Sequence, residues 1–253
     1  MSKGICGYYY GSHDIIRYND VIGVTASSGY GRKNNLTTMK HHLGCGERYL
    51  QGYRNIDFPS TDHTVQQKSV ADERADITSL KYESGTIDEV RLHHVFEHFN
   101  RAQACGLVAV WHDWIKVDGF LHIEVPDFFW TAAAVLSPFT SFRRKMVGIR
   151  HIFGSQEAHW AVHFDGYSAG RLKLMLSSFG FEVTTIRRNS WRGTHNVEVV
   201  ARRLPGAISR DEKIAAARNY LHEFCVDDTD TEKAMLGVWL KYFIKQLDKS
   251  GVK

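Results

Sequence analysis

The chain has 253 residues, a mass of 28.9 kDa and a formal net charge of +4 when its fourteen histidines are counted as neutral. This length suits one sizeable domain with an appendage, and 43% apolar with 24% charged residues is typical of a folded globular protein, which excludes a disordered or fibrous chain. The weak positive charge falls short of a nucleic-acid-binding footprint, so we expect no nucleic-acid partner.

Residues 1–38 are rich in Tyr, Gly and Ser, show no clear period, and are predicted to form an N-terminal extension that packs on the core. They lack the continuous apolar stretch of a secretory signal, and the longest mildly apolar run, 131–139, is too short to cross a bilayer. The four cysteines form no C-x-x-C pair, so neither a disulfide framework nor a zinc site is indicated. We expect a cytoplasmic protein without a transmembrane segment.

Residues 39–204 alternate short β-rich runs with longer helical ones, which is the pattern of a mostly parallel sheet covered by helices. A further short run, Ala75–Leu80, is weighed as a strand between the second and third. Helical periodicity marks Arg101–Lys116 and Ser168–Phe179, and Gly180 ends the latter. The predicted strands are Met39–Leu43, Tyr53–Phe58, Ile87–His93, Gly119–Val125, Phe181–Arg187 and Val197–Arg202.

The tail, residues 205–253, is predicted to be helical. Two apolar stripes indicate this, the first formed by Ile214, Ala217, Leu221 and Phe224 and the second by Leu236, Leu240, Phe243 and Leu247. We prefer a helical cap on the domain or a subunit contact, and hence a homo-oligomer through these helices, over a helix lying on a membrane surface.

A glycine turn follows the first predicted strand, with Gly44 and Gly46 on either side of Cys45. Glycines at a strand-to-helix turn let a ligand approach the backbone closely, although a G-x-G by itself also fits an ordinary tight turn. Asp57 ends the next strand, where a carboxylate can accept hydrogen bonds from both hydroxyls of a ribose. Asp76 follows at a further step, where a carboxylate can receive an adenine amino group. The ordered series favours a nucleoside-containing cofactor.

These segments resemble the successive motifs of Rossmann-like class I methyltransferases that use S-adenosylmethionine (SAM). The resemblance spans about residues 40–203 and is strongest to a bacterial branch that includes enzymes tailoring glycans and other small acceptors. It says little about the acceptor itself. The segments that carry it are Leu43–Gly46, Gly52–Asp57, Ala75–Ile77, Ile87–Val90, His94–Phe99 and Ile123–Phe128.

The resemblance implies an α/β fold with a seven-stranded, mostly parallel sheet, an antiparallel last strand and helices on both faces. It also implies that SAM lies across the carboxyl ends of the first strands. The amino-acid end of SAM is then expected at Leu43, Gly44, Cys45 and Gly46, its ribose at Asp57 and its adenine at Asp76 and Ile77, with His94 also beside the cofactor.

The connection after the glycine turn departs from this pattern. Only about ten residues separate Gly46 from Asp57, whereas a parallel crossover with its helix normally takes a dozen or more. The first helix is therefore predicted to be vestigial. Our hypothesis is that residues 1–38 pack where that helix is missing.

A first histidine cluster, His93–His98, lies at the end of the predicted strand Ile87–His93 and at the start of the helix expected after it. His94, Glu97 and His98 share one helical face, and their H-x-x-E-H string also matches an inverted zinc-peptidase motif, which we discount inside a methyltransferase frame. A divalent metal, such as magnesium, bound by these three residues is an alternative that we do not favour. A structural or cofactor-orienting part for Glu97 and His98 is preferred, and His98 is also a candidate catalytic residue.

A second cluster, Glu157–Tyr167, lies in the insertion at about 129–170, which in this fold commonly forms the acceptor wall. A hydroxyl acceptor needs a base, and histidine titrates close to neutral pH. His163 is the first candidate for this base, with Asp165 to orient it or to bind the acceptor, and His159 next. The alternative is a polar loop with local hydrogen bonds. Aromatic side chains of the insertion fit either a sugar-stacking surface or the core: Trp130, Phe139, Phe142 and Trp160.

The leading functional hypothesis is O-methylation of a hydroxyl on a sugar, a polysaccharide or a glycosylated small molecule, with SAM as the donor. The rivals are methylation of a non-sugar metabolite or natural product at oxygen or nitrogen, and a SAM-binding partner subunit without catalysis. Pro126–Phe128 lacks the Pro-Pro-aromatic motif of nucleobase amino-methyltransferases, so DNA methylation is disfavoured.

Overall fold

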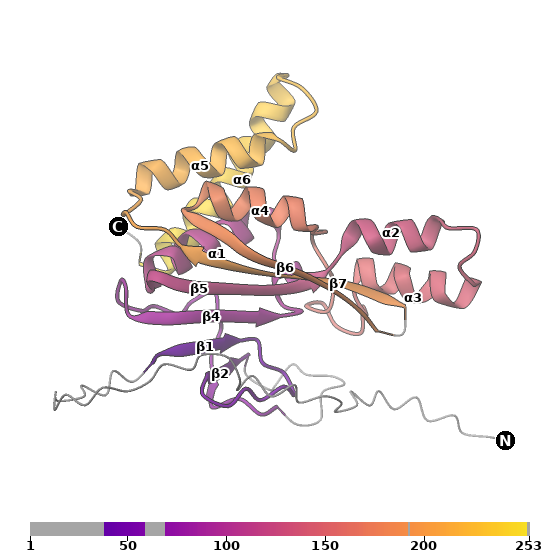
Figure 1. Ribbon diagram of the computed structural model, residues 1–253. Helices are drawn as coiled ribbons and strands as arrows, with labels where there is room; N and C mark the ends of the chain where they lie inside the picture. Colours follow the sequence, from indigo (N-terminus) through magenta and orange to yellow (C-terminus); the bar gives the residue numbers. More distant parts are fainter. Residues whose placement is uncertain (1–37, 59–68, 192, 252–253) are drawn as a thin grey trace. The chain divides into compact units, whose positions relative to one another are not determined.

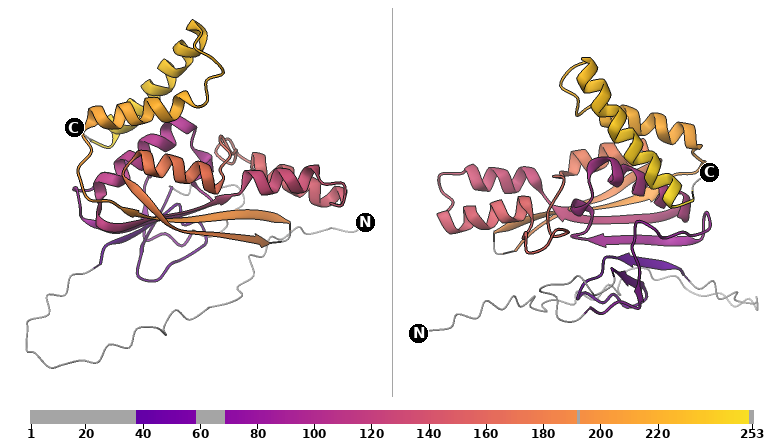
Figure 2. Two further views of the ribbon diagram at one scale, coloured as in Figure 1. Left: turned by 45° about the horizontal axis from the view of Figure 1, so that its top comes forward. Right: turned by 180° about the vertical axis from the view of Figure 1, so that it is seen from behind.

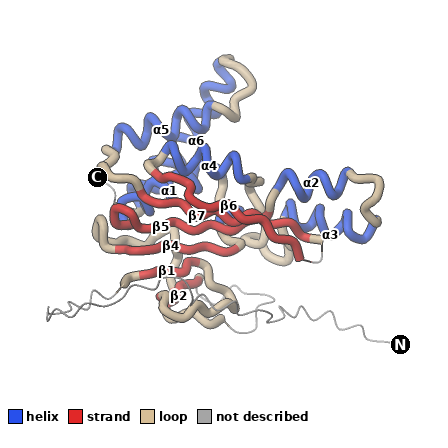
Figure 3. Tube along the Cα trace, viewed as in Figure 1, coloured by secondary structure: helices blue, strands red, loops and turns tan. Residues whose placement is uncertain are grey.

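The computed structural model describes residues 38–58, 69–191 and 193–251, all of which lie in one compact unit, Thr37–Lys253. Its sheet has seven strands. Figures 1 and 3 show how the longer strands lie side by side. In chain order the strands are β1 (Lys40–Leu43), β2 (Arg54–Asp57), β3 (Glu73–Arg74), β4 (Ile87–His93), β5 (Ile115–Pro126), β6 (Phe181–Trp191) and β7 (Thr194–Arg203).

The strands follow the order β3-β2-β1-β4-β5-β7-β6 across the sheet. Neighbours from β3 to β5 pair in parallel, and β7 is antiparallel to both β5 and β6. The predicted seven-stranded, mostly parallel sheet with an antiparallel last strand is confirmed. Because β1 lies between β2 and β4, the carboxyl ends of these three strands meet at one edge of the sheet.

One face of the sheet is apolar and lies under helices. Helices α1 (Arg101–Trp114) and α4 (Ala169–Ser178) pack next to the strands, with α5 (Arg210–His222) and α6 (Asp230–Lys249) on the outer side of α1, all on the same side of the sheet (Figure 2). These four helices cover one face, whereas the resemblance implied helices on both faces. Alternate strand residues point into this core, as the two-residue period of a strand requires. The fully buried ones include Val90, Leu92, Leu121, Ile123, Val197 and Val199.

The helix ends follow local capping chemistry. The Asn100 side chain accepts a hydrogen bond from the Gln103 amide at the start of α1, and Ser168 does the same for Arg171 at the start of α4. After α4, Gly180 adopts φ 76°, a left-handed conformation that ends a helix at little cost to glycine. Both predicted helices are confirmed within two residues at each end.

One candidate strand was wrong, and one strand begins earlier than predicted. Ala75–Leu80 is not a strand, because Asp76 Oδ1 accepts hydrogen bonds from the Thr78 amide and hydroxyl, and such local bonds compete with a sheet ladder. The strand in this region is β3, two residues long. Helix α1 also ends earlier than expected, and β5 begins directly at Ile115.

The insertion after β5 holds two helices that were not predicted. Helix α2 (Phe128–Leu136) and helix α3 (Phe142–Phe153) pack against each other beside the end of β7 (Figure 1). Asp127 caps α2 by accepting a hydrogen bond from the Trp130 amide. Three of the insertion's aromatic side chains lie at the surface rather than in the core, with exposed fractions of 55% for Trp130, 95% for Phe139 and 76% for Phe142.

The connection between β1 and β2 contains no helix in residues 44–53, so the prediction of a vestigial first helix is confirmed. Instead the chain turns back at once, and the Gly44 and Cys45 amides both donate to the Ile56 carbonyl, over 2.8 and 3.1 Å. The hypothesis that residues 1–38 pack at this place concerns residues outside the described part of the chain, apart from residue 38.

The apolar stripes of the tail are used inside the molecule. Leu236, Leu240, Phe243 and Leu247 are buried where α6 packs on α1, as expected of a helical cap. Subunit association through these helices stays a prediction. Among the described helices, none combines the length and apolarity needed to span a bilayer.

Close packing of α1 on α6 depends on Gly106. A Cβ atom at this position would lie 2.7 Å from Gln246 Cβ, and the carbonyl oxygen of Phe243 would be 3.3 Å away. Gly106→Ala should therefore lower the free energy of unfolding by roughly 1–3 kcal/mol, the usual cost of overpacking, in urea-unfolding measurements.

Gly237, in α6, provides the matched control because nothing lies within 4 Å of its virtual Cβ. Gly237→Ala should raise the free energy of unfolding by about 0.5–1 kcal/mol through helix propensity alone. Equal effects of the two substitutions would contradict the proposed α1–α6 contact.

Candidate functional site

The glycine turn and Asp57 lie together at the carboxyl edge of the sheet. The Gly46 amide donates to Asp57 Oδ2 over 3.0 Å, and the Phe58 amide donates to Oδ1 over 2.8 Å. Asp57 itself is 7% exposed. Ser69 Oγ also donates to Oδ2, over 3.5 Å. A carboxylate oxygen has two lone pairs, so Oδ1 keeps one free for a ligand hydroxyl, and Oδ2 can accept a second hydroxyl only in place of Ser69. The structure therefore brings the first two predicted cofactor segments into contact.

Packing against a neighbouring segment requires glycine at position 44. Gly44 adopts φ 68°, and a Cβ there would lie 2.4 Å from a methyl group of Val95, which follows β4. Leu43 and Cys45 on either side are buried. The turn is thus fitted against the segment that begins the first histidine cluster.

Asp76 is already engaged by the protein. Besides its bonds from Thr78, its Oδ2 accepts hydrogen bonds from Ser79 Oγ and from Lys249 Nζ of α6, over 2.9 and 2.8 Å. Burial raises the pKa of Asp76, but the bonds from Lys249, Thr78 and Ser79 outweigh it and lower the pKa to about 2. Asp76 therefore anchors the tail, and its neighbour Ile77 is buried at 8% exposure.

A buried carboxylate, Glu97, forms the centre of the histidine-rich region. It belongs to the short helix η2 (Phe96–His98), and its side chain is 2% exposed. His94 Nδ1 lies 3.3 Å and His163 Nε2 lies 3.9 Å from Glu97 Oε1. Glu97, His98 and His163 each offer a ligand atom within 4.8 Å of the others. We call these three residues the Glu97 cluster.

The insertion completes the Glu97 cluster by docking on η2. The Phe164 amide donates to the Glu97 carbonyl over 2.9 Å, and His98 Nδ1 donates to the Val162 carbonyl over 3.1 Å. These two bonds hold His163 against His98, with the ring centroids 4.8 Å apart. The two predicted histidine clusters are therefore one site, and the tertiary fold adds His163 to Glu97 and His98.

The electrostatics of this site favour an ionised Glu97 and neutral His163. Burial by itself raises the pKa of Glu97, but the neighbouring His94, His98 and His163 outweigh it and lower the pKa to about 2. Burial lowers the pKa of His163, so its ring carries a free lone pair near neutral pH. Burial also lowers the pKa of His94, but Glu97 outweighs this and raises it.

Two predicted catalytic residues lie outside the cluster. Asp165 forms a bidentate ion pair with Arg171, with one of the bonds at 2.6 Å, and no hydrogen bond joins it to His163 in the described structure. His159 is exposed. His94 is 39% exposed and adopts a left-handed φ of 53° as the chain leaves β4.

A series of buried, hydrogen-bonded polar side chains crosses the sheet next to the site. It was not predicted from the sequence. Arg91 Nε donates to His93 Nε2, His93 Nδ1 donates to His42 Nε2, and His42 Nδ1 donates to Asn55 Oδ1, each over 3.0 Å. Because each ring donates at one nitrogen and accepts at the other, both histidines are neutral. Burial is the main cause that lowers their pKa values, that of His42 to about 4. The signal was the alternation of polar residues Glu89, Arg91 and His93 along β4.

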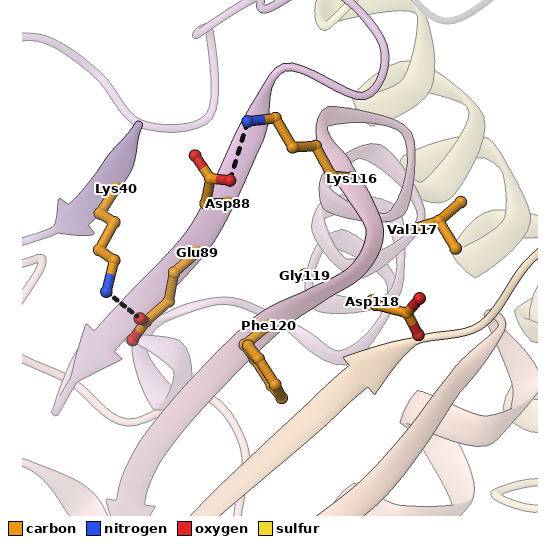
Figure 4. Close-up of a pocket in the computed structure, with 8 residues that line it drawn as sticks. All are labelled: Lys40, Asp88, Glu89, Lys116, Val117, Asp118, Gly119 and Phe120. Carbon is orange, nitrogen blue, oxygen red and sulfur yellow. Dashed lines mark hydrogen bonds and ion pairs between the residues drawn. The ribbon is translucent and has the colours of Figure 1, made fainter. Parts of the chain in front are cut away.

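A pocket of about 260 Å³ lies at the other edge of the sheet (Figure 4). Two ion pairs cross its lining, Lys116 with Asp88 at 2.8 Å and Lys40 with Glu89 at 3.4 Å. These residues stand at the amino ends of the strands, whereas ligands of open α/β sheets bind outside the carboxyl ends. The pocket is therefore not the candidate site.

Comparison with known proteins gives solved structures only, since no protein-family model and no curated protein sequence matches the chain. A SAM-dependent methyltransferase from Methanosarcina mazei is 14% identical over 66% of this chain and 93% of its own, with a TM-score of 0.46. One from Mesorhizobium loti is 14% identical over 66% and 91%, with a TM-score of 0.46. The 1,6-didemethyltoxoflavin-N1-methyltransferase of Burkholderia thailandensis is 15% identical over 66% and 71%, with a TM-score of 0.44. Likenesses this remote identify neither the cofactor nor the acceptor of this chain.

The neutral state of His41, a buried histidine of β1, can be tested through the pH dependence of stability. It is 1% exposed, and neither ring nitrogen has a hydrogen-bond partner among the described residues. Burial, followed by the charge of Arg54, lowers the pKa of His41 from 6.5 to about 4. Below pH 6.5 the unfolded chain therefore binds a proton at His41 that the folded protein does not bind. This proton costs no stability above pH 6.5, and it lowers the stability increasingly as the pH falls towards 4.

His41→Phe should remove this penalty. Urea unfolding at pH 7.5 and pH 5.0 should show a smaller loss of stability on acidification, by up to about 2 kcal/mol, while the stability at pH 7.5 stays equal or rises. His222→Gln is the control, because His222 is 53% exposed. An unchanged pH dependence in His41→Phe would show that His41 is not buried in its neutral form.

Proposed function

We propose that the protein is a SAM-dependent methyltransferase. The observation that carries this proposal is the contact of the Gly46 amide with the Asp57 carboxylate at the carboxyl ends of neighbouring strands. The strand order, with an antiparallel β7, supports it as the sheet that the class I resemblance implies. SAM supplies an electrophilic methyl group on a sulfonium, and the residues of the chain have to bind it, orient it and exclude water.

The residues proposed to hold SAM are those predicted from the sequence. The turn Leu43–Gly46 would receive the amino-acid end, and Asp57 would accept the ribose hydroxyls. His94, exposed at the end of β4, would face the same edge. Asp76 and Ile77 remain the proposed adenine segment, but Asp76 could receive the adenine amino group only beside its bonds from Thr78, Ser79 and Lys249.

The proposed acceptor is a hydroxyl group. In the reaction the acceptor oxygen forms a bond to the methyl carbon, the bond from that carbon to sulfur breaks, and the sulfur keeps the electron pair. The hydroxyl proton needs an acceptor, and neutral His163 beside Glu97 provides one. Asp165, paired with Arg171, is proposed to position the insertion and not to orient His163.

A sugar or glycan is the acceptor class that we favour. Carbohydrates stack on exposed aromatic rings, and the α2–α3 insertion presents Trp130, Phe139 and Phe142 at the surface. A non-sugar metabolite methylated at oxygen or nitrogen is the rival within enzymes, and a SAM-binding subunit without catalysis is the rival outside them. Incubation with labelled SAM and a panel of sugars, glycans, phenols and amines separates the three.

Asp57→Asn tests the cofactor site. It keeps the size of the side chain but removes its charge and one acceptor oxygen, so the Kd for SAM should rise about 10- to 100-fold, as expected for one hydrogen bond to a charged group. Calorimetry measures the Kd. The control is Asp228→Asn, since Asp228 is 81% exposed in the tail. An unchanged Kd in Asp57→Asn would place the ribose elsewhere.

His163→Gln tests the chemical step. The Kd for SAM should stay within about twofold, while turnover of a hydroxyl acceptor should fall by roughly 100-fold or more, the usual contribution of a proton acceptor. Radiolabel transfer under saturating SAM measures turnover. Full turnover in His163→Gln would exclude His163 from the reaction.

A further inference from the structure

We propose that the Glu97 cluster binds one divalent transition-metal cation, with Glu97, His98 and His163 as its ligands. The sequence suggested a metal only through His94, Glu97 and His98, and did not favour it. The fold replaces His94 by His163, which comes from the insertion 65 positions after His98. The resulting set is two imidazoles and one carboxylate.

The first argument is the state of the Glu97 carboxylate. It is 2% exposed, and neither of its oxygens accepts a hydrogen bond of good geometry from the described residues. Its nearest cationic partner is His94, whose Nδ1 lies 3.3 Å from Oε1 but whose side chain is 39% exposed. A buried carboxylate that lacks such bonds costs several kcal/mol unless a cation compensates it. The residues that surround it are histidines, whose neutral rings are metal ligands.

The second argument is the orientation of the two rings. His98 donates from Nδ1 to the Val162 carbonyl, which leaves the Nε2 lone pair free. The His163 backbone is held by its amide, which donates to the Phe153 carbonyl over 3.2 Å, and the ring Nε2 lies 3.9 Å from Glu97 Oε1. Histidines that bind metals usually donate their other ring N–H to a carbonyl or carboxylate, which fixes the tautomer.

The distances between the three ligand atoms suit a first-row cation if the side chains move a few tenths of an ångström closer together. The three ligand atoms lie within 4.8 Å of one another, and bonds of about 2.0–2.2 Å allow two ligand atoms to be at most about 4.4 Å apart. Two imidazoles favour Zn²⁺, Fe²⁺ or Mn²⁺ over Mg²⁺, which prefers oxygen ligands. Three protein ligands leave at least one coordination position open.

The open coordination position would let the cation bind the acceptor hydroxyl. Only this part of the inference rests on the proposed function. His94 reaches the same Glu97 oxygen as His163 and is 39% exposed, so this side of the carboxylate lies nearest to solvent. An acceptor hydroxyl entering from there would bind the cation, which lowers the pKa of a bound hydroxyl. With the cation bound, His163 is a ligand, and the hydroxyl proton leaves to solvent on the side of the exposed His94 ring. In the metal-free protein, His163 remains the proton acceptor.

The test measures metal binding without SAM or acceptor. The full chain is stripped with a chelator and titrated with Zn²⁺, Mn²⁺ and Mg²⁺ in a calorimeter, and Mn²⁺ binding is followed by electron paramagnetic resonance. We expect one equivalent of Zn²⁺ or Mn²⁺ to bind, with Mg²⁺ at least 10-fold weaker. Glu97→Gln and His163→Gln should each weaken binding by 10-fold or more, whereas His222→Gln should not.

Thermal unfolding separates ligand loss from misfolding. Zn²⁺ at one fixed concentration should raise the Tm of the wild type and of His222→Gln, because a ligand that binds only the folded state stabilises it, and should raise the Tm of a folded Glu97→Gln variant by clearly less. Absence of binding to the wild type, or equal affinity in Glu97→Gln and His163→Gln, would overturn the inference. SAM affinity is measured apart from this, so a protein that binds SAM but no metal refutes the cation alone, and one that binds metal but no SAM refutes the proposed function alone.

Discussion

Parallel pairing of β1 between β2 and β4 is the constraint on which the candidate site depends. It places the carboxyl ends of three strands at one edge, although the residues that follow them lie far apart in the sequence. Gly46 then reaches Asp57, and Gly44 packs on Val95. The short β1–β2 connection is tolerated because its amides bond to Ile56 on the neighbouring strand and so need no helix.

The second contributor to the site is the insertion after β5. Its return segment is tied to η2 by two hydrogen bonds, and it brings His163 to a carboxylate that is buried among histidines. Neither segment is a site by itself. Glu97 without His163 is a buried charge close to one partner, and His163 without η2 is a loop histidine. The chemistry proposed for the protein depends on this docking.

Much of the sheet could be predicted from the sequence because its signals are local. The alternation in β4 and the β-rich runs of β6 and β7 located these strands, and glycine ended α4. Ala75–Leu80 failed because the side chain of Asp76 bonds its own turn. Helix α3 was not predicted although Phe142, Met146, Ile149 and Phe153 repeat at helical spacing, and these side chains lie 38–76% exposed instead of in the core. A local pattern cannot show which long-range partner a polar side chain will find.

The sequence by itself therefore determined the order of the strands along the chain, the short first connection and the identity of the residues at the strand ends. These depend on the period of apolar residues, on glycine and on spacing, all of which act over a few residues. Only the tertiary structure decided that Asp165 pairs with Arg171, that Asp76 holds Lys249, and that His163 joins Glu97. Burial and long-range contact set these partners, because a charged group inside a protein has to be matched by whichever groups the fold brings within a few ångströms.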